Sequence, residues 1–185
     1  MNRLSITVLV LACFVCVSVS PVQAGFGWDP RKQDKLAESC DRAIQTFKEK
    51  DPELKDFFDK AYGYAVFPTV GKAGIGIGGA HGSGLVYVNH TPVGRTSLTQ
   101  LSIGWQLGGQ AYSEIIFFKD KTSFDYFKNE NFELGAQVSA VAVTMGASAD
   151  ADYSGGVAVF TMAKGGLMYE ASVGGQKFTY RPLEM

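Results

Sequence analysis

The sequence has few cysteines and histidines, and almost no excess charge of either sign. Its 185 residues include three cysteines and two histidines, and 17 Lys and Arg stand against 18 Asp and Glu. A general nucleic-acid binder carries a clear basic excess, so this class is excluded. No Cys, His and carboxylate residues follow zinc-site spacing, and no serine lies in a Gly-x-Ser-x-Gly motif. These absences predict a non-enzymatic protein without a metal or another cofactor, and they leave the oligomeric state open.

The sequence also lacks a hydrophobic run long enough to cross a membrane as a helix. Residues 4–19 form an uncharged, largely apolar run that Ser20-Pro21 breaks, and it has 16 residues where about 20 are needed. Arg3 precedes this run, and Val22-Gln23-Ala24 follows it with small residues at a cleavage site. The layout predicts a signal peptide over residues 1–24, cut after Ala24, and export to the periplasm or cell envelope. Two alternatives stay open: a peptide retained as an anchor, and a lipoprotein cut before Cys13.

After cleavage, Cys40 is the one cysteine left, so no disulfide can form within the mature chain. We therefore predict one domain over residues 25–185 that depends on its own hydrophobic core. Cys40 itself falls among apolar helical positions, which favours a small buried hydrophobic residue over a reactive thiol.

Two helices are predicted at the start of this domain. Asp29-Pro30 and Asp51-Pro52 each place an N-cap carboxylate before a proline in the first turn. Gly63 is expected to end the second helix in a left-handed conformation. Apolar residues recur at three- and four-residue steps in both helices, namely Leu36, Cys40, Ala43, Ile44 and Phe47, then Leu54, Phe57, Phe58 and Ala61.

From Tyr64 onward the apolar period changes from 3.6 to 2, which indicates strands. Spacers with glycine, Asn-His or Lys-Gly join most of them and predict hairpins, hence a mainly antiparallel sheet. Asp120–Asn129 interrupts the pattern and is predicted as a short helix. The fold class is therefore α+β. The predicted strands cover residues 64–68, 73–79, 84–89, 97–107, 110–118, 134–145, 156–163, 166–173 and 177–180.

Glycine is the residue in excess, with 22 in the chain. In strands it lets a sheet bend or another backbone come close. The spacing from Gly74 to Gly79 also matches a dinucleotide-binding motif, but a strand follows it, and no Asp or Glu occurs between Lys72 and Glu114. We therefore predict a strongly curved, barrel-like sheet with the structural glycines Gly74, Gly76, Gly78, Gly79, Gly84, Gly104, Gly108 and Gly109.

The start of the first helix is the candidate contact with a membrane. Arg31, Lys32 and Lys35 follow Phe26 and Trp28, and basic residues beside aromatic ones are typical of a segment that meets anionic lipid. The alternative is a solvated helix start, because acidic residues are interspersed with the basic ones.

One string resembles the start of a calcium-binding loop. Asp150 to Gly155 has the spacing of such a loop, but its twelfth position is Thr161 instead of glutamate. We predict a structural turn before the next strand, with calcium bound by Asp150 and Asp152 as the alternative.

Several further motifs resemble the signature of the SYLF domain family, in order through roughly residues 35–181. Together they identify nearly the whole predicted mature chain as similar to this family. They are Tyr64-Ala65-Val66-Phe67-Pro68-Thr69-Val70-Gly71-Lys72-Ala73-Gly74, Gly82-Ser83-Gly84, Ser102-Ile103-Gly104-Trp105-Gln106-Leu107-Gly108-Gly109-Gln110, Ser113-Glu114-Ile115-Ile116-Phe117-Phe118, Phe132-Glu133-Leu134-Gly135-Ala136 and Lys164-Gly165-Gly166-Leu167.

The resemblance implies lipid binding, with phosphoinositides as ligands of eukaryotic relatives and actin as a partner in fungi. An exported protein meets neither, so anionic phospholipid of the cell envelope is the expected ligand. The resemblance carries Lys72 over directly and the segment from Trp28 to Lys35 loosely. Lys72 is alternatively a solvated lysine or a partner of Glu114. The alternative function is a structural or scaffold module that binds an envelope protein.

Overall fold

The computed structural model describes residues 30–104, 109–129, 132–135, 138–165 and 173–183. Its helices are α1 (Pro30–Lys50), α2 (Lys55–Lys60) and α3 (Lys121–Phe127), with the short 3-10 helix η1 (Pro52–Leu54) between the first two. Its strands are β1 (Gly63–Val88), β2 (Thr91–Gly104), β3 (Gly109–Phe118), β4 (Ala140–Ala142), β5 (Val157–Lys164) and β6 (Gln176–Pro182). The α+β class is confirmed. The predicted signal peptide and its cleavage site lie outside the described residues.

All six strands of the described part form one sheet in the order β4-β5-β3-β1-β2-β6. Every neighbouring pair is antiparallel except β4 and β5. The sheet has two edges, at β4 and β6, so the prediction of a barrel-like sheet is corrected to an open one. The mainly antiparallel pairing is confirmed, and β1 and β2 are joined by a tight hairpin turn.

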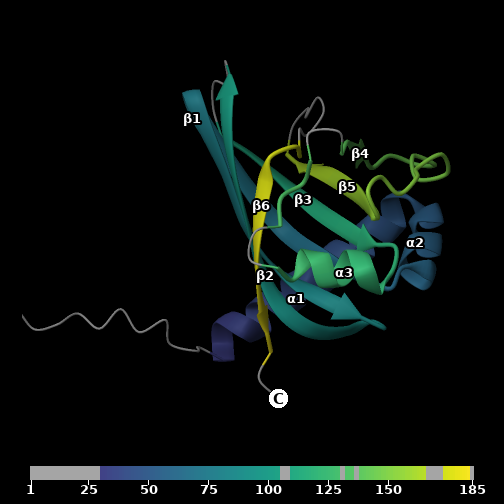
Figure 1. The fold of residues 1–185 in the computed structure, drawn as a ribbon. Coiled ribbons are helices and arrows are strands. Elements are labelled where there is room, and N and C mark those ends of the chain that lie inside the picture. The colour runs from purple at the N-terminus through teal and green to yellow at the C-terminus, as the bar shows by residue number, and fades with distance from the viewer. Residues whose placement is uncertain (1–29, 105–108, 130–131, 136–137, 166–172, 184–185) are drawn as a thin grey trace, which may run out of the picture.

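Strand β1 doubles back on itself. Residues 63–73 pair with β3 and residues 76–88 pair with β2, so the reversal lies in the glycine-rich stretch between them. A Cβ on Gly63 would lie 2.6 Å from the Tyr87 carbonyl oxygen, and one on Gly84 would lie 2.2 Å from that of Val66. The two halves therefore run side by side, and the long ribbon in Figure 1 holds two sheet positions.

Two of the predicted turns have different outcomes. Asn89 and His90 join β1 to β2 with φ of 49° and 62°, the conformation of a tight hairpin turn. Residues 80–83, predicted as a spacer, instead stay extended and pair with β2 along their length. Gly63 is also corrected: it starts β1 and is not a left-handed helix stop.

The helices cover both faces of the sheet, as Figure 1 shows. We call the face under α1 and α2 the helix face, and the opposite face, under α3, the inner face. On the helix face, Cys40 and Phe47 of α1 and Phe58 of α2 pack with Phe117 and Phe160. The apolar stripe predicted for α1 is therefore the surface that binds the helix to the sheet. No described helix is both long and apolar enough to span a membrane.

The inner face carries the larger aromatic core. Phe124 and Phe127 of α3 pack there with Phe118 of β3, and Phe132 and Phe178 complete the group. Rings of Phe118 and Phe127 lie 4.7 Å apart between centroids, and those of Phe127 and Phe132 lie 5.1 Å apart. The short helix predicted for residues 120–129 is confirmed, and its role is to close this core.

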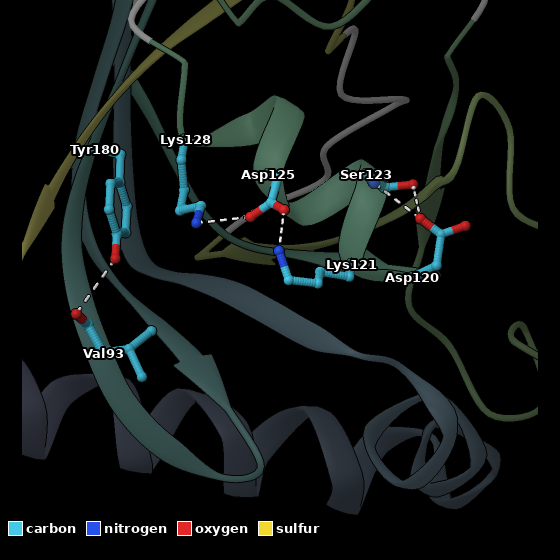
Figure 2. A network of polar contacts seen from close by, with 7 residues as sticks. All are labelled: Val93, Asp120, Lys121, Ser123, Asp125, Lys128 and Tyr180. Carbon is cyan, nitrogen blue, oxygen red and sulfur yellow. Dashed lines mark hydrogen bonds and ion pairs between the residues drawn. The ribbon is translucent and has the colours of Figure 1, made fainter.

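Polar side chains fix the start and the exposed side of α3. Asp120 is the N-cap: its Oδ1 accepts hydrogen bonds from Ser123 N at 2.8 Å and Ser123 Oγ at 2.9 Å (Figure 2). Asp125 lies between Lys121 and Lys128 and forms an ion pair with each, the latter at 2.7 Å. These pairs are largely exposed, so they stabilise the helix only slightly.

Asp51 does more than cap a helix. Its carboxylate accepts from Glu53 N at 3.2 Å, as the predicted N-cap, but also from Ser148 N at 2.8 Å and Gly146 N at 3.3 Å. Burial alone would raise the pKa of Asp51, but these hydrogen bonds together outweigh it and lower the pKa. One buried carboxylate thus fastens the turn before β5 to the N-terminal helices.

The segment after α3 contacts both edges of the sheet. At the β6 edge, Phe178 N donates to Phe132 O at 3.1 Å and Leu134 N donates to Gln176 O at 3.0 Å. Further along, β4 pairs with β5 at the other edge. The predicted strand over residues 134–145 is therefore wrong except for residues 140–142, because the segment leaves one edge to reach the other. The strand predicted over 166–173 lies, up to residue 172, outside the described residues.

Candidate functional site

Helix α1 carries three stripes, since residues three and four apart share a face. The apolar stripe packs on the sheet. A second stripe is basic and hydroxylated, and a third is acidic. The basic stripe consists of Arg31, Lys35, Ser39, Arg42, Thr46 and Lys50. The acidic stripe consists of Asp34, Glu38, Asp41 and Glu49, with the neutral Gln45 between the last two.

The basic stripe borders a cleft of about 470 Å³ between α1 and the sheet. Three cationic residues line it, Arg42 and Lys50 from α1 and Lys164 from the end of β5, and none of its lining residues is acidic. Buried Met162 and Ala43 supply apolar surface. The other lining residues are Ser39, Thr46, Pro68, Thr69, Ser113 and Ala163.

The cations of the cleft have few competing partners. Lys164 Nζ donates to Thr69 Oγ1 at 2.7 Å. Arg42 Nη1 lies 2.7 Å from Glu38 Oε1, but the two side chains are 63% and 66% exposed, so the pair is weak. Neither Lys50 nor Lys164 forms an ion pair with the residues that the structure describes. The arrangement is therefore suited to an anion from outside the chain.

The structure brings together some predicted lipid-binding residues and separates others. Arg31 and Lys35 are exposed on the basic stripe that continues into the cleft. Lys32 lies in the first turn of α1, and Trp28 lies outside the described residues. Lys72 of β1 pairs with Gln110 of β3. It lies on the same side of β1 as Val70, which belongs to the hydrophobic core of the inner face. Lys72 is therefore on the other face of the sheet from the cleft.

The chain is similar in sequence to a described protein family and to a curated protein. Residues 99–184 match the Ysc84 family, described as "Las17-binding protein actin regulator". Beta cell expansion factor A of Aeromonas veronii is 34% identical over 141 residues, which are 75% of this chain and 53% of that protein. The predicted resemblance to the SYLF family is confirmed over residues 99–184, which match the domain model of that family. The chain spans about half the length of the curated relative it matches, and the SYLF domains are binding domains.

The match to the SYLF family model begins near the end of β2 and therefore leaves out α1 and β1. Of the three cations that line the cleft, Lys164 lies inside the matched range, while Arg42 and Lys50 precede it.

The glycines of the chain differ in which atoms a Cβ at each position would contact. Gly84 faces the Val66 backbone, whereas Gly79 and Gly109 have only ordinary contacts, at 3.7 Å and 4.0 Å. Gly94, which the sequence did not single out, lies against Tyr180. A Cβ on Gly94 would lie 2.2 Å from the Tyr180 ring, and the Tyr180 hydroxyl donates to Val93 O at 3.4 Å (Figure 2). Gly74, Gly76, Gly78 and Gly104 lie where β1 reverses and β2 ends, and Gly108 lies outside the described residues.

Glu114 is a buried acid that sequence reasoning assigned no role of its own. It is fully buried on the inner face, where Gln176 Nε2 donates to Glu114 Oε2 at 3.0 Å and to Tyr112 Oη at 3.2 Å. Burial raises the pKa of Glu114 to about 8, although the bond from Gln176 opposes this. No ion pair joins it to Lys72 in the described part of the chain, and Glu114 Oε1 has no hydrogen-bond partner there. The sequence pattern could have predicted this burial, because Glu114 alternates with Tyr112 and Ile116 on an apolar strand face.

The structure also shows the surroundings of Cys40 and of the string that resembles a calcium-binding loop. Cys40 is fully buried, and burial raises the pKa of its thiol to about 12, so it is a core residue and not a reactive thiol. Asp150 and Asp152 are exposed in a turn that leads to Gly155 and Gly156, both with positive φ, before β5. No group of three potential metal ligands occurs among the described residues.

Proposed function

We propose that this chain is an exported, non-enzymatic domain that binds anionic phospholipid at the surface of the cell envelope. The observation that carries the proposal is the basic stripe of α1, which begins at exposed Arg31 and Lys35 and continues to Lys50. Membership of a family of binding domains supports it. The predicted signal peptide supports export.

The stripe has the dimensions of a membrane contact. A helix rises 1.5 Å per residue, so Arg31 and Lys50 are about 28 Å apart along α1. The apolar stripe is already packed on the sheet, so the helix meets lipid through charge and not through insertion. Each basic side chain near an anionic surface contributes about 1 kcal/mol, so several together give weak, reversible and salt-dependent binding.

Vesicle co-sedimentation tests this proposal. We expect the protein to sediment with vesicles that contain phosphatidylglycerol, at about 0.05 M salt, and to be released at about 0.5 M. The triple variant Arg31→Glu, Lys32→Glu and Lys35→Glu should lose at least nine tenths of this binding, because it reverses the two charges at one end of the stripe and that of the neighbouring Lys32.

A matched control changes the same charge elsewhere. The triple variant Lys55→Glu, Lys60→Glu and Lys119→Glu alters three exposed lysines outside α1 and should bind vesicles like the natural protein. Equal loss in both triple variants would mean that net charge, and not the stripe, controls binding. Absence of vesicle binding by the natural protein would overturn the lipid proposal in favour of a protein-binding scaffold.

Export has its own measurement. The intact mass of the protein isolated from its native envelope should correspond to a chain that begins at Gly25. A mass that retains residues 1–24 would contradict cleavage and favour an anchored protein.

A further inference from the structure

The cleft between α1 and the sheet has the lining of an anion site, and we propose that it binds a phosphate group. The phosphate belongs to a phospholipid headgroup or to a soluble phosphate ester, which share this chemistry. The lipid source rests on the proposed function, whereas phosphate recognition by the cleft does not. Nothing in the family description assigns a ligand to this cleft.

The cleft gathers three cationic side chains. Arg42, Lys50 and Lys164 come from two segments far apart in the chain, and folding brings them to one cleft without an acidic lining residue. Apart from the exposed pair of Arg42 with Glu38, these cations have no counter-charge in the described part of the chain, so an anion that lies among them is stabilised. Arginine also offers a planar fork of N–H donors that matches two phosphate oxygens at once.

The hydrogen-bond donors of the cleft point to the same ligand. Ser39 Oγ donates to Lys35 O and Thr46 Oγ1 donates to Arg42 O, so these two hydroxyl protons are already used within α1. Thr69 Oγ1 accepts from Lys164 Nζ, which leaves the Thr69 proton for a ligand. Ser113 Oγ likewise donates to Pro68 O. A ligand can therefore take the Thr69 proton, N–H groups of Lys50 and Lys164 and, once Glu38 is displaced, those of Arg42, a set that suits an acceptor-rich anion.

The shape of the cleft accommodates more than an isolated ion. A volume of about 470 Å³ falls within the range of small-molecule sites. Buried Met162 and Ala43 form apolar surface beside the exposed cations. A phosphate ester of a short polyol places its charge at the cations and its carbon atoms against this apolar surface.

Glu38 is the internal competitor for this site. Its Oε1 lies 2.7 Å from Arg42 Nη1, but both side chains are mostly in water, and such exposed pairs are weak. A phosphate that carries more charge and also contacts Lys50 and Lys164 displaces Glu38 from Arg42. The ion pair therefore sets how tightly the cleft binds phosphate and does not block it.

An NMR titration of the full protein tests the cleft directly. The two probes are inorganic phosphate and dihexanoyl phosphatidylglycerol below its micelle concentration. We expect saturable shifts of the backbone amides of Thr46, Thr69 and Lys164 with both probes. The double variant Lys50→Gln and Lys164→Gln should weaken binding at least tenfold, while Lys60→Gln with Lys119→Gln should leave it unchanged.

The possible results separate this inference from the proposed function. Shifts at the cleft with both probes, or with the lipid alone, support the inference and name the source of the phosphate. If vesicles bind and neither probe shifts the cleft amides, the inference is overturned and the membrane function stands. If phosphate shifts the cleft and vesicles do not bind, the inference stands and the membrane function is overturned. Equal weakening in both double variants would show a general charge effect and would also overturn it.

Discussion

The two faces of the sheet differ in where their ionisable side chains lie relative to solvent. On the helix face, α1 and α2 bury aromatic rings, such as Phe58 and Phe117 at 4.9 Å between centroids, and leave cations at the open cleft. On the inner face, Glu114 and Gln176 are fully buried among the aromatic residues. Apart from Asp51, whose carboxylate is held by backbone N–H groups, the helix face keeps its charges where a ligand can reach them, whereas the inner face encloses Glu114 within the fold.

This difference predicts where pH and where salt act on the molecule. Exposed cations respond to ionic strength, because solvent screens them. A buried acid responds to pH, because ionisation would place a charge in a medium that solvates it poorly. Amino-acid substitutions on the two faces and in β1 test these differences.

The substitution Glu114→Gln should remove most of the pH dependence of stability. Between pH 4.5 and about 8 the folded protein keeps the Glu114 proton and the unfolded chain has lost it, so stability falls as pH rises. The slope is about 1.4 kcal/mol per pH unit over this window, and it levels off above it. Denaturant unfolding from pH 4 to pH 9 measures it. Parallel curves for the natural protein and the variant would contradict a buried proton on Glu114.

The substitution Gly84→Val should destabilise the protein by about 3 kcal/mol, because even a Cβ would lie 2.2 Å from the Val66 carbonyl oxygen. Gly71→Ala is the matched control in the same strand: a Cβ there has nothing within 4 Å, so its effect should stay within about 0.5 kcal/mol. Thermal and denaturant unfolding compare the two. Similar losses would mean that β1 does not depend on the close approach of its halves.

The substitution Glu38→Gln should change stability by less than about 0.5 kcal/mol, because it removes an exposed i,i+4 ion pair. It should nevertheless increase the affinity of the cleft for inorganic phosphate about twofold to threefold, since Arg42 loses its competing carboxylate. Glu49→Gln, on the same acidic stripe, is the control. An unchanged phosphate affinity in Glu38→Gln would remove Arg42 from the site.

The sequence predicted those elements whose signals are local. The apolar stripe of α1, the Asp51 cap, the short helix α3 and the Asn89-His90 turn each depend on neighbouring residues, and all four are present. The strand over residues 134–145 failed because its partners lie at two different edges of the sheet. Periodicity reports which face of a segment is apolar, but not which edge the segment joins.

The candidate site shows the same limit. Arg31, Lys32 and Lys35 were identifiable because they are adjacent in sequence. The cleft was not, because Lys164 reaches Thr69 only through the pairing of β5 with β3 and of β3 with β1. The Gly84 contact likewise requires the reversal of β1, which alternating glycines permit but do not specify.

The placement of β6 at the sheet edge has a consequence for how the chain folds. Strands β1 and β2 join through the Asn89-His90 turn, and the pairs of β1 with β3 span 36 (Ala73 to Gly109) to 55 residues (Gly63 to Phe118). The pairs of β2 with β6 span more, from 76 residues (Gln100 to Gln176) to 88 residues (Gly94 to Pro182). Contacts of such separation form slowly. We therefore expect β6 to dock last, and during synthesis the β2 edge to stay unpaired until the C-terminal residues have emerged.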